Sequence, residues 1–187
     1  MDVPFERVTV REAMRRETGL DIAELKETEA LRSAARAAGY PISDGATSWD
    51  DVFFSVFVSA VEPRLGATRP TFLIEYPAHM AALARLKPGE PAVAERFELY
   101  AAGLELANGF SELTDGPEQR RRLVQEQEER RAAGREVYPL DEQFLDAVGR
   151  MPPASGVAVG FDRLAMLLLG AERIEELLLF PAVQEWA

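Results

Sequence analysis

Residues 156–170 constrain the fold of this chain more than any other stretch, because a short strand pattern passes there directly into an apolar helix pattern. Val157 and Val159 alternate with small residues, as in a β-strand. Asp162 stands where a helix N-cap would stand, ahead of a helical run that Gly170 ends. The stretch therefore predicts a buried strand that turns sharply into a helix.

Arg163 lies at this junction. A guanidinium is always charged and offers a planar fork of donors, so an arginine fixed at such a corner suits the binding of a phosphate or carboxylate. The alternative is an arginine of the first helical turn that pairs with a surface carboxylate, because strand–helix corners occur in folds of every function. The spacing alone leaves both interpretations open.

Length and composition narrow the class of protein. The 187 residues suffice for one core, and they include no cysteine, which excludes disulfides and thiolate metal sites. The formal net charge is −11 with only two lysines, which argues against a broad basic surface for nucleic acid. No apolar run approaches the roughly 18 residues of a membrane helix, and the start of the chain lacks a secretory signal. We therefore expect a cytoplasmic protein without a membrane partner.

The first third of the chain has helical patterns. Helices are expected over residues 8–18, 21–38 and 48–62. Their expected caps and stops are Thr9 or Asp21, Gly19, Gly39 and Ser48. Prolines and a glycine between residues 63 and 70 mark a boundary. We therefore expect residues 1–69 to form a helical segment and residues 70–187 a second part. The two parts together are expected to form one compact unit.

Acidic residues recur through an apolar, strand-like stretch over residues 95–113. Glu105 and Glu112 flank the dipeptide Asn108-Gly109, which tolerates positive φ and favours a bend that would bring the two carboxylates together. Two such carboxylates suit Mg²⁺, which usually shares its oxygen ligands with nucleotide phosphates, or a substrate ammonium. The alternative is a pair of exposed glutamates on a hairpin.

Two other features are interpreted as structural. The arginines and glutamates that alternate over residues 118–133 favour a solvated helix face. His79 is the only histidine and so cannot belong to a multi-histidine metal site.

The two chemical stretches together resemble a known family. Glu105-Leu106-Ala107-Asn108-Gly109-Phe110-Ser111-Glu112-Leu113 and Gly156-Val157-Ala158-Val159-Gly160-Phe161-Asp162-Arg163-Leu164 are similar to the C-terminal catalytic half of class II lysyl-tRNA synthetases. The closest resemblance is to their shorter paralogues, the elongation factor P lysine ligases. It is close over residues 70–187 and implies an α+β fold with an antiparallel β-sheet of the class II synthetase type, flanked by helices and lacking the N-terminal part of the core.

The resemblance also implies roles for individual residues. Arg163 matches the catalytic arginine that contacts ATP phosphate, and Gly160 matches a glycine beside the adenine. Glu105 matches an acid that contacts ATP and Mg²⁺, assisted by the backbone of Leu106. The substrate-binding positions are matched by Asn108, Phe110 and Glu112, of which Glu112 is also implied near the metal.

Two motifs of the family have no counterpart in this sequence: the first, which builds the dimer interface, and the second, whose arginine assists adenylation. The resemblance therefore implies ATP-dependent activation of lysine or a lysine-like amino acid and its transfer to elongation factor P, with the activity of this chain left open. The alternative is a non-catalytic remnant or regulatory module that binds amino acid or nucleotide. A separately encoded N-terminal half would complete the site, and a homodimer is the other partner considered. Because the anticodon-binding barrel is not found and the chain is acidic, tRNA is not expected as a partner.

Overall fold

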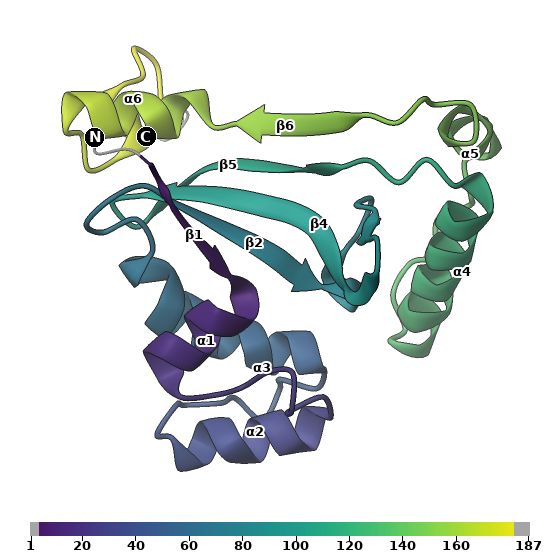
Figure 1. Ribbon diagram of the computed structural model, residues 1–187, viewed down its shortest axis with the longest axis horizontal. Helices are drawn as coiled ribbons and strands as arrows, with labels where there is room; N and C mark the ends of the chain where they lie inside the picture. Colours follow the sequence, from purple (N-terminus) through teal and green to yellow (C-terminus); the bar gives the residue numbers. More distant parts are fainter. Residues whose placement is uncertain (1–3, 182–187) are drawn as a thin grey trace. The chain divides into compact units, whose positions relative to one another are not determined.

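The computed structural model describes residues 4–181 and is an α+β fold built on a six-stranded sheet (Figure 1). The sheet order is β1-β2-β4-β5-β6, with β3 paired to β4. The strands are β1 (Glu6–Thr9), β2 (Thr71–Pro77), β3 (Leu86–Lys87), β4 (Glu90–Ala101), β5 (Leu104–Ser111) and β6 (Ser155–Val159). β1 pairs with β2 in parallel and β3 with β4 antiparallel. The expected antiparallel sheet with flanking helices is confirmed, with the β1–β2 pair as a parallel exception.

Six α-helices accompany the sheet in the described residues. They are α1 (Val10–Thr18), α2 (Thr28–Ala37), α3 (Trp49–Val56), α4 (Gly116–Ala132), α5 (Glu142–Val148) and α6 (Phe161–Leu169). A π-helical turn over Phe57–Val61 prolongs α3. Short 3₁₀ turns follow at Glu62–Arg64, Ala78–Met80 and Ile174–Glu176.

The chain divides into two compact units, each assembled from separate segments. The first unit contains the chain up to Ile74, Phe97–Asn108 and the residues from Ala158 on, whereas the second contains Glu75–Arg96 and Gly109–Val157. The boundary expected near residue 69 falls inside the first unit, because the parallel ladder between β1 and β2 joins the two sides of that boundary.

Helix caps fix the helical part of the first unit. Thr9 and Ser48 each form a capping box with an acid three residues on, which satisfies the free N–H groups of α1 and α3. Both caps were predicted, and both are confirmed. In Figure 1 the helices α1, α2 and α3 gather at one end of β1, and Phe53 of α3 stacks on Trp49 and Phe57 in their buried interior.

Four predicted details differ from the structure. The second helix begins at Thr28, not at Asp21, because the Asp21 carboxylate instead binds Arg11 and accepts from the Ala23 N–H. Residues 6–9 form a strand that was not anticipated. Asp162 lies in the first turn of α6, and Gly160 occupies the N-cap. The strand β6 was expected to be buried, but Val157 and Val159 are 59% and 57% exposed.

The turn in the acidic stretch also lies elsewhere than expected. Ala102 and Gly103 adopt φ values of 53° and 75° and connect β4 to β5, as a two-residue hairpin loop requires. β5 then runs without interruption through Asn108 and Gly109. The predicted bend at this dipeptide is therefore wrong, because cross-strand pairing holds it in an extended strand.

Gly66 supports this hairpin by close approach of two backbones. Its φ is 69°, and a Cβ built there would lie 2.5 Å from the Tyr100 carbonyl oxygen. Its own carbonyl accepts from the Ala102 N–H at 2.8 Å, and the Leu65 carbonyl accepts from Gly103 at 3.0 Å. Only a residue without a side chain fits between these groups.

We predict that Gly66→Ala lowers the free energy of unfolding by about 3 kcal/mol, because the methyl group meets backbone that cannot move without disturbing the hairpin. Gly19→Ala is the matched control: Gly19 has a similar φ of 77° but nothing within 4 Å of its added Cβ. The control should lose only about 1 kcal/mol from backbone strain. Urea denaturation of both variants checks this, and equal losses would contradict the role of the close approach.

The second unit is built around α4 and α5. The Ala81, Ala84 and Ala94 side chains form a small buried cluster against which Leu86 and Phe110 pack. The guanidinium of Arg122 on α4 donates to the carbonyls of Ala82 and Ala84 at 2.9 and 2.8 Å. Otherwise α4 buries little more than Gln119, in agreement with the solvated helix face predicted for it.

Candidate functional site

Arg163 lies in the first turn of α6, directly after β6, as its sequence position predicts. The junction of β6 and α6 contacts β5, because the Gly160 N–H donates to the Leu106 carbonyl at 2.8 Å. From there Arg163 Nη1 donates to the Glu105 carbonyl at 2.9 Å and approaches the Glu105 carboxylate to 3.3 Å. The arginine side chain stays 51% exposed. The structure thus brings together Arg163, Glu105, Leu106 and Gly160, the residues expected to bind ATP.

The Arg163 side chain runs beside Gly160. A Cβ built on Gly160 would lie 3.4 Å from Cδ of Arg163, an ordinary van der Waals distance. The corner therefore has room for a small side chain at this position.

A second carboxylate, Glu98 on β4, joins the site in the first unit. Its side chain is almost fully buried, with 8% of the residue exposed. The Tyr100 hydroxyl donates to it at 2.7 Å, and the Asn108 amide donates to it at 3.1 Å. Asn108, predicted to bind substrate, is therefore seen here orienting a buried acid.

Electrostatic coupling extends this group to Glu62, at the end of the α3 region. Burial raises the pKa of Glu62 above its usual value, the charges of Glu98 and Glu105 raise it further, and Arg163 opposes the shift. Burial also raises the pKa of Tyr100, again with a contribution from Glu98. The negative charges of Glu98 and Glu105 therefore both act on Glu62, and an added cation would relieve this repulsion.

Sequence reasoning assigned no role to Glu98 or Glu62. The position of Glu98, four residues before the Ala102-Gly103 loop, could have predicted its place in the site. A hairpin centred on that loop aligns the end of β4 with the start of β5, and so places Glu98 among the acids of the next strand. Glu62 has no comparable sequence signal, because its place depends on how the helical region packs.

Glu112 and Phe110 belong to the second unit. The Glu112 N–H donates to the Ala154 carbonyl at 3.0 Å, and a Cβ built on Gly156 would meet its Oε1 at 2.7 Å. No bend at Asn108-Gly109 brings Glu112 to Glu105. Within residues 4–181 no group of three or more acidic or histidine side chains is arranged to hold a metal ion.

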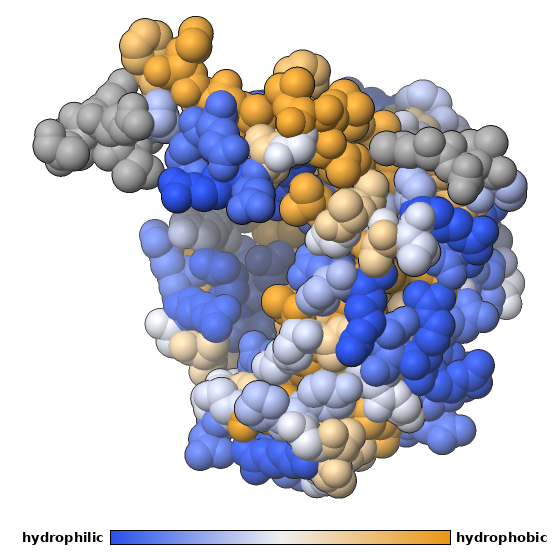
Figure 2. All heavy atoms as spheres, turned by 90° about the vertical axis from the view of Figure 1, so that its left-hand side faces the viewer, coloured by the Kyte–Doolittle hydropathy of each residue, from blue (hydrophilic) through white to orange (hydrophobic). Residues whose placement is uncertain are grey.

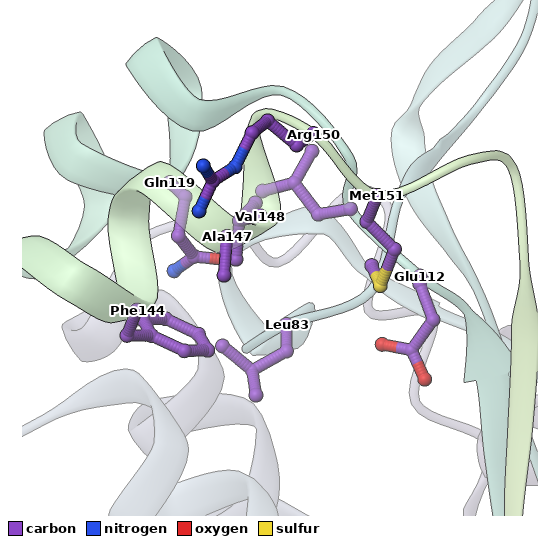
Figure 3. A pocket seen from close by; sticks show the side chains of 9 residues that line it. Leu83, Glu112, Gln119, Phe144, Ala147, Val148, Arg150 and Met151 are labelled. Atoms are coloured by element: carbon purple, nitrogen blue, oxygen red, sulfur yellow. The ribbon is translucent and has the colours of Figure 1, made fainter.

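Glu112 instead lines a pocket of about 540 Å³ in the second unit. Figure 3 shows its carboxylate beside Met151, with Leu83 and Phe144 on the apolar wall. The buried side chain of Gln119 and the guanidinium of Arg150 add polar groups to the lining. The pocket therefore combines an apolar wall with one carboxylate and one guanidinium, so its lining carries charges of both signs.

Comparison with known proteins places the chain in a family. The profile of the tRNA synthetases class II (D, K and N) matches residues 1–184. The chain belongs to this family. It is 42% identical over 180 residues to a "Lysine--tRNA ligase" of Rhizobium leguminosarum bv. trifolii, covering 96% of this chain and 36% of the relative. It is 40% identical over 178 residues to the "Elongation factor P--(R)-beta-lysine ligase" of Salmonella arizonae, covering 95% of this chain and 55% of the relative.

This class II synthetase chain thus spans between about a third and just over half the length of these relatives. The resemblance proposed from the sequence motifs is confirmed, including its restriction to part of the family's length. Across residues 4–181, no helix is both long and apolar enough to cross a bilayer.

The raised pKa of Glu62 gives a pH prediction. A folded state that holds this proton more tightly than the unfolded chain loses stability as pH rises from the unfolded value near 4.5 through the raised folded value. Glu62→Gln removes this loss, so the variant should equal the wild type below pH 4.5 and exceed it in thermal stability at pH 7. Melting curves from pH 4 to 8 measure the difference. Glu29→Gln is the control, because the Glu29 side chain is 74% exposed. A stability difference between Glu62→Gln and the wild type that does not change with pH would contradict the raised pKa of Glu62.

Proposed function

We propose that this chain carries the ATP clamp of a ligase that activates lysine or a lysine-like amino acid as its adenylate and transfers it to a lysine of elongation factor P. The observation that carries the proposal is Arg163, which the β6–α6 corner holds against the Glu105 carbonyl and carboxylate. Relatives about 40% identical, named as ligases of lysine or β-lysine, support the substrate class.

The guanidinium and carboxylate groups of this site are of the kinds that bind ATP and Mg²⁺. Arg163 is exposed enough to exchange its contact with Glu105 for a phosphate oxygen, which a guanidinium binds well. Glu105 and Glu98 offer oxygen ligands to Mg²⁺, which typically takes one or two carboxylates and completes its shell with phosphates and water. When bound, the cation neutralises charge on the phosphates. Leu106 and Gly160, whose backbones are joined by a hydrogen bond at this corner, are proposed to lie beside the nucleotide.

The reaction proposed has two steps. A carboxylate oxygen of the amino acid attacks the α-phosphorus of ATP, the bond to the bridging oxygen of the β-phosphate breaks, and pyrophosphate leaves. The acceptor amine then attacks the carbonyl carbon, loses a proton and releases AMP. Arg163 stabilises the negative charge on the phosphates during the first step. Glu112, assisted by Asn108 and Phe110, is proposed to bind the amino-acid substrate through its ammonium group.

We predict that Arg163→Ala lowers the rate of lysine-dependent pyrophosphate exchange at least about 100-fold, because it removes a charge aimed at the reacting phosphates. Arg173→Ala is the matched control: Arg173 lies in the same unit, is 72% exposed and pairs only locally with Glu175. The Arg173→Ala variant should keep the wild-type rate of pyrophosphate exchange. A folded wild-type protein that gives no exchange with ATP, Mg²⁺ and either lysine or (R)-β-lysine would exclude catalysis by this chain alone.

Glu112→Ala is predicted to weaken binding of the amino acid by about tenfold or more, because the ammonium group loses a charge-assisted partner. Asp146→Ala, an exposed acid in the same unit, is the control. Calorimetry with lysine and (R)-β-lysine measures both. Unchanged affinity in Glu112→Ala would remove Glu112 from the substrate site.

A second candidate is a non-catalytic module that binds amino acid or nucleotide. It is favoured by the limited span of the chain, which matches 36% of a full lysine–tRNA ligase. Binding of lysine or ATP without exchange supports this module, whereas exchange excludes it. The names of the relatives give two acceptors, tRNA and elongation factor P. An assay for transfer of labelled amino acid to each of them shows which acceptor this chain uses.

A further inference from the structure

Gln119 occupies a buried position that a glutamine rarely takes. It is the only buried residue of the mostly polar helix α4, and 2% of it is exposed. Glutamine is usually found at the surface. Within residues 4–181 its side chain has no hydrogen-bond partner. Because burial of an amide without a partner is unfavourable, this amide is suited to a partner from outside the chain.

The Gln119 amide can be reached from the pocket of the second unit. Gln119 is one of the residues that line this pocket, and its polar atoms are not among the fully enclosed atoms that lack a partner. Figure 3 shows the amide above Phe144, among the lining side chains. A small molecule in the pocket can therefore form hydrogen bonds with it.

Arg150 adds a second donor to the same lining. It lies two residues after the end of α5 and is exposed. In the part of the chain that the structure describes, its guanidinium has neither an ion pair nor a hydrogen bond. In the view of Figure 3 the Arg150 and Gln119 side chains lie at one end of the lining. A guanidinium and an amide N–H both donate to carboxylate oxygens, so this end of the pocket suits a carboxylate.

An apolar wall completes the lining. It includes Leu83, Phe144 and Val148. Leu83 and Phe144 are 40% and 38% exposed, so a ligand has apolar surface to cover. The Leu113 N–H donates to the Leu83 carbonyl at 2.9 Å, which fixes the Leu83 backbone before any ligand binds. Such a preformed wall suits an aliphatic or aromatic stem.

Glu112 determines what the other end of such a ligand can carry. Its carboxylate also lines the pocket, and Figure 3 shows it beside Met151, away from the Arg150 guanidinium. Among the described residues it has no ion-pair partner. A second carboxylate on the ligand would be repelled by this charge. The lining therefore favours ligands with a single carboxylate.

Exposed apolar side chains alone do not define such a site. Helix α6 of the first unit carries an apolar stripe in which Phe161, Leu168 and Leu169 are 78%, 69% and 74% exposed. Figure 2 shows hydrophobic side chains at the top of the view, where α6 lies in Figure 1. The buried residue of that helix, Met166, is apolar. The pocket of the second unit differs because a buried amide adjoins its apolar wall.

We propose that the pocket of the second unit binds an amphipathic monocarboxylate, whose carboxylate accepts hydrogen bonds from Gln119 and Arg150 and whose apolar stem packs on Leu83 and Phe144. The ligand is thus a small organic acid with one carboxylate on an aliphatic or aromatic body. The proposal concerns binding in the second unit and does not depend on ATP or on the ligase function.

Hexanoate is the probe, and its binding to the full chain is measured by NMR titration. Arg150→Ala should weaken this binding about tenfold or more, because the carboxylate loses a charge-assisted hydrogen bond. Binding of hexanol, which has the same stem without a charge, should not change. Arg131→Ala is the matched control, since Arg131 is an exposed arginine of the same unit outside the pocket lining. Wild-type protein that does not bind hexanoate, or equal affinity in the two variants, overturns the proposal.

Adipate tests the part assigned to Glu112. It has the stem of hexanoate with a second carboxylate, and we expect it to bind the wild type about fivefold or more weakly than hexanoate because of charge repulsion. Glu112→Ala should remove this difference. Adipate that binds the wild type as tightly as hexanoate overturns the preference for a single carboxylate.

Gln119→Leu separates ligand binding from folding. Leucine has a similar size and no polar side-chain atom, so the variant should melt at the wild-type temperature or above it, because an unpartnered buried amide is removed. Hexanoate binding should nevertheless weaken about fivefold or more. A variant that melts at a lower temperature and binds hexanoate as the wild type does would show a structural role and overturn the assignment of Gln119. Because these readouts use neither ATP nor lysine, the proposal and the ligase function can fail independently of each other.

Discussion

The two-residue loop at Ala102 and Gly103 is the constraint on which the candidate site depends. Its left-handed backbone connects β4 to β5. The carbonyls of Gly66 and Leu65 accept hydrogen bonds from Ala102 and Gly103, and the close approach leaves no room for a side chain at Gly66. Because the loop fixes how the two strands align, it brings Glu98 and Tyr100 of one strand to Glu105 and Asn108 of the other. A shift by one residue would turn every one of these side chains to the opposite face of the sheet.

The charge balance at the site follows from this alignment. Glu98 is buried and is kept in place by hydrogen bonds from Tyr100 and Asn108, while Glu105 contacts Arg163. Burial of Glu62 raises its pKa, the negative charges of Glu98 and Glu105 raise it further, and Arg163 opposes the shift. Such an environment favours a cation and positions the guanidinium beside it, which is the electrostatic arrangement needed to bind a nucleotide phosphate with its metal ion.

The exposed side of β6 and α6 contrasts with the well-formed interior of the helical region. Phe53 stacks between aromatic rings, and the capping boxes at Thr9 and Ser48 complete their helices. By comparison, α6 has an apolar stripe with only Met166 buried. The same short helix therefore carries both Arg163 and the exposed apolar stripe.

Local features could be predicted from the sequence. Thr9 and Ser48 were identified as helix starts, and Gly19, Gly39 and Gly170 as stops, because caps depend on contacts within three or four residues. The sequence also determined the family, through the motifs around Glu105 and Arg163, and the corner that carries Arg163. Four features became clear only from the tertiary structure. They are the position of the turn between β4 and β5, the presence of Glu98 and Glu62 in the acidic group, the place of Glu112 in the second unit, and the exposure of β6. These features depend on which distant segments pair and pack, and the local alternation of apolar and polar residues is the same for a buried strand as for an open edge.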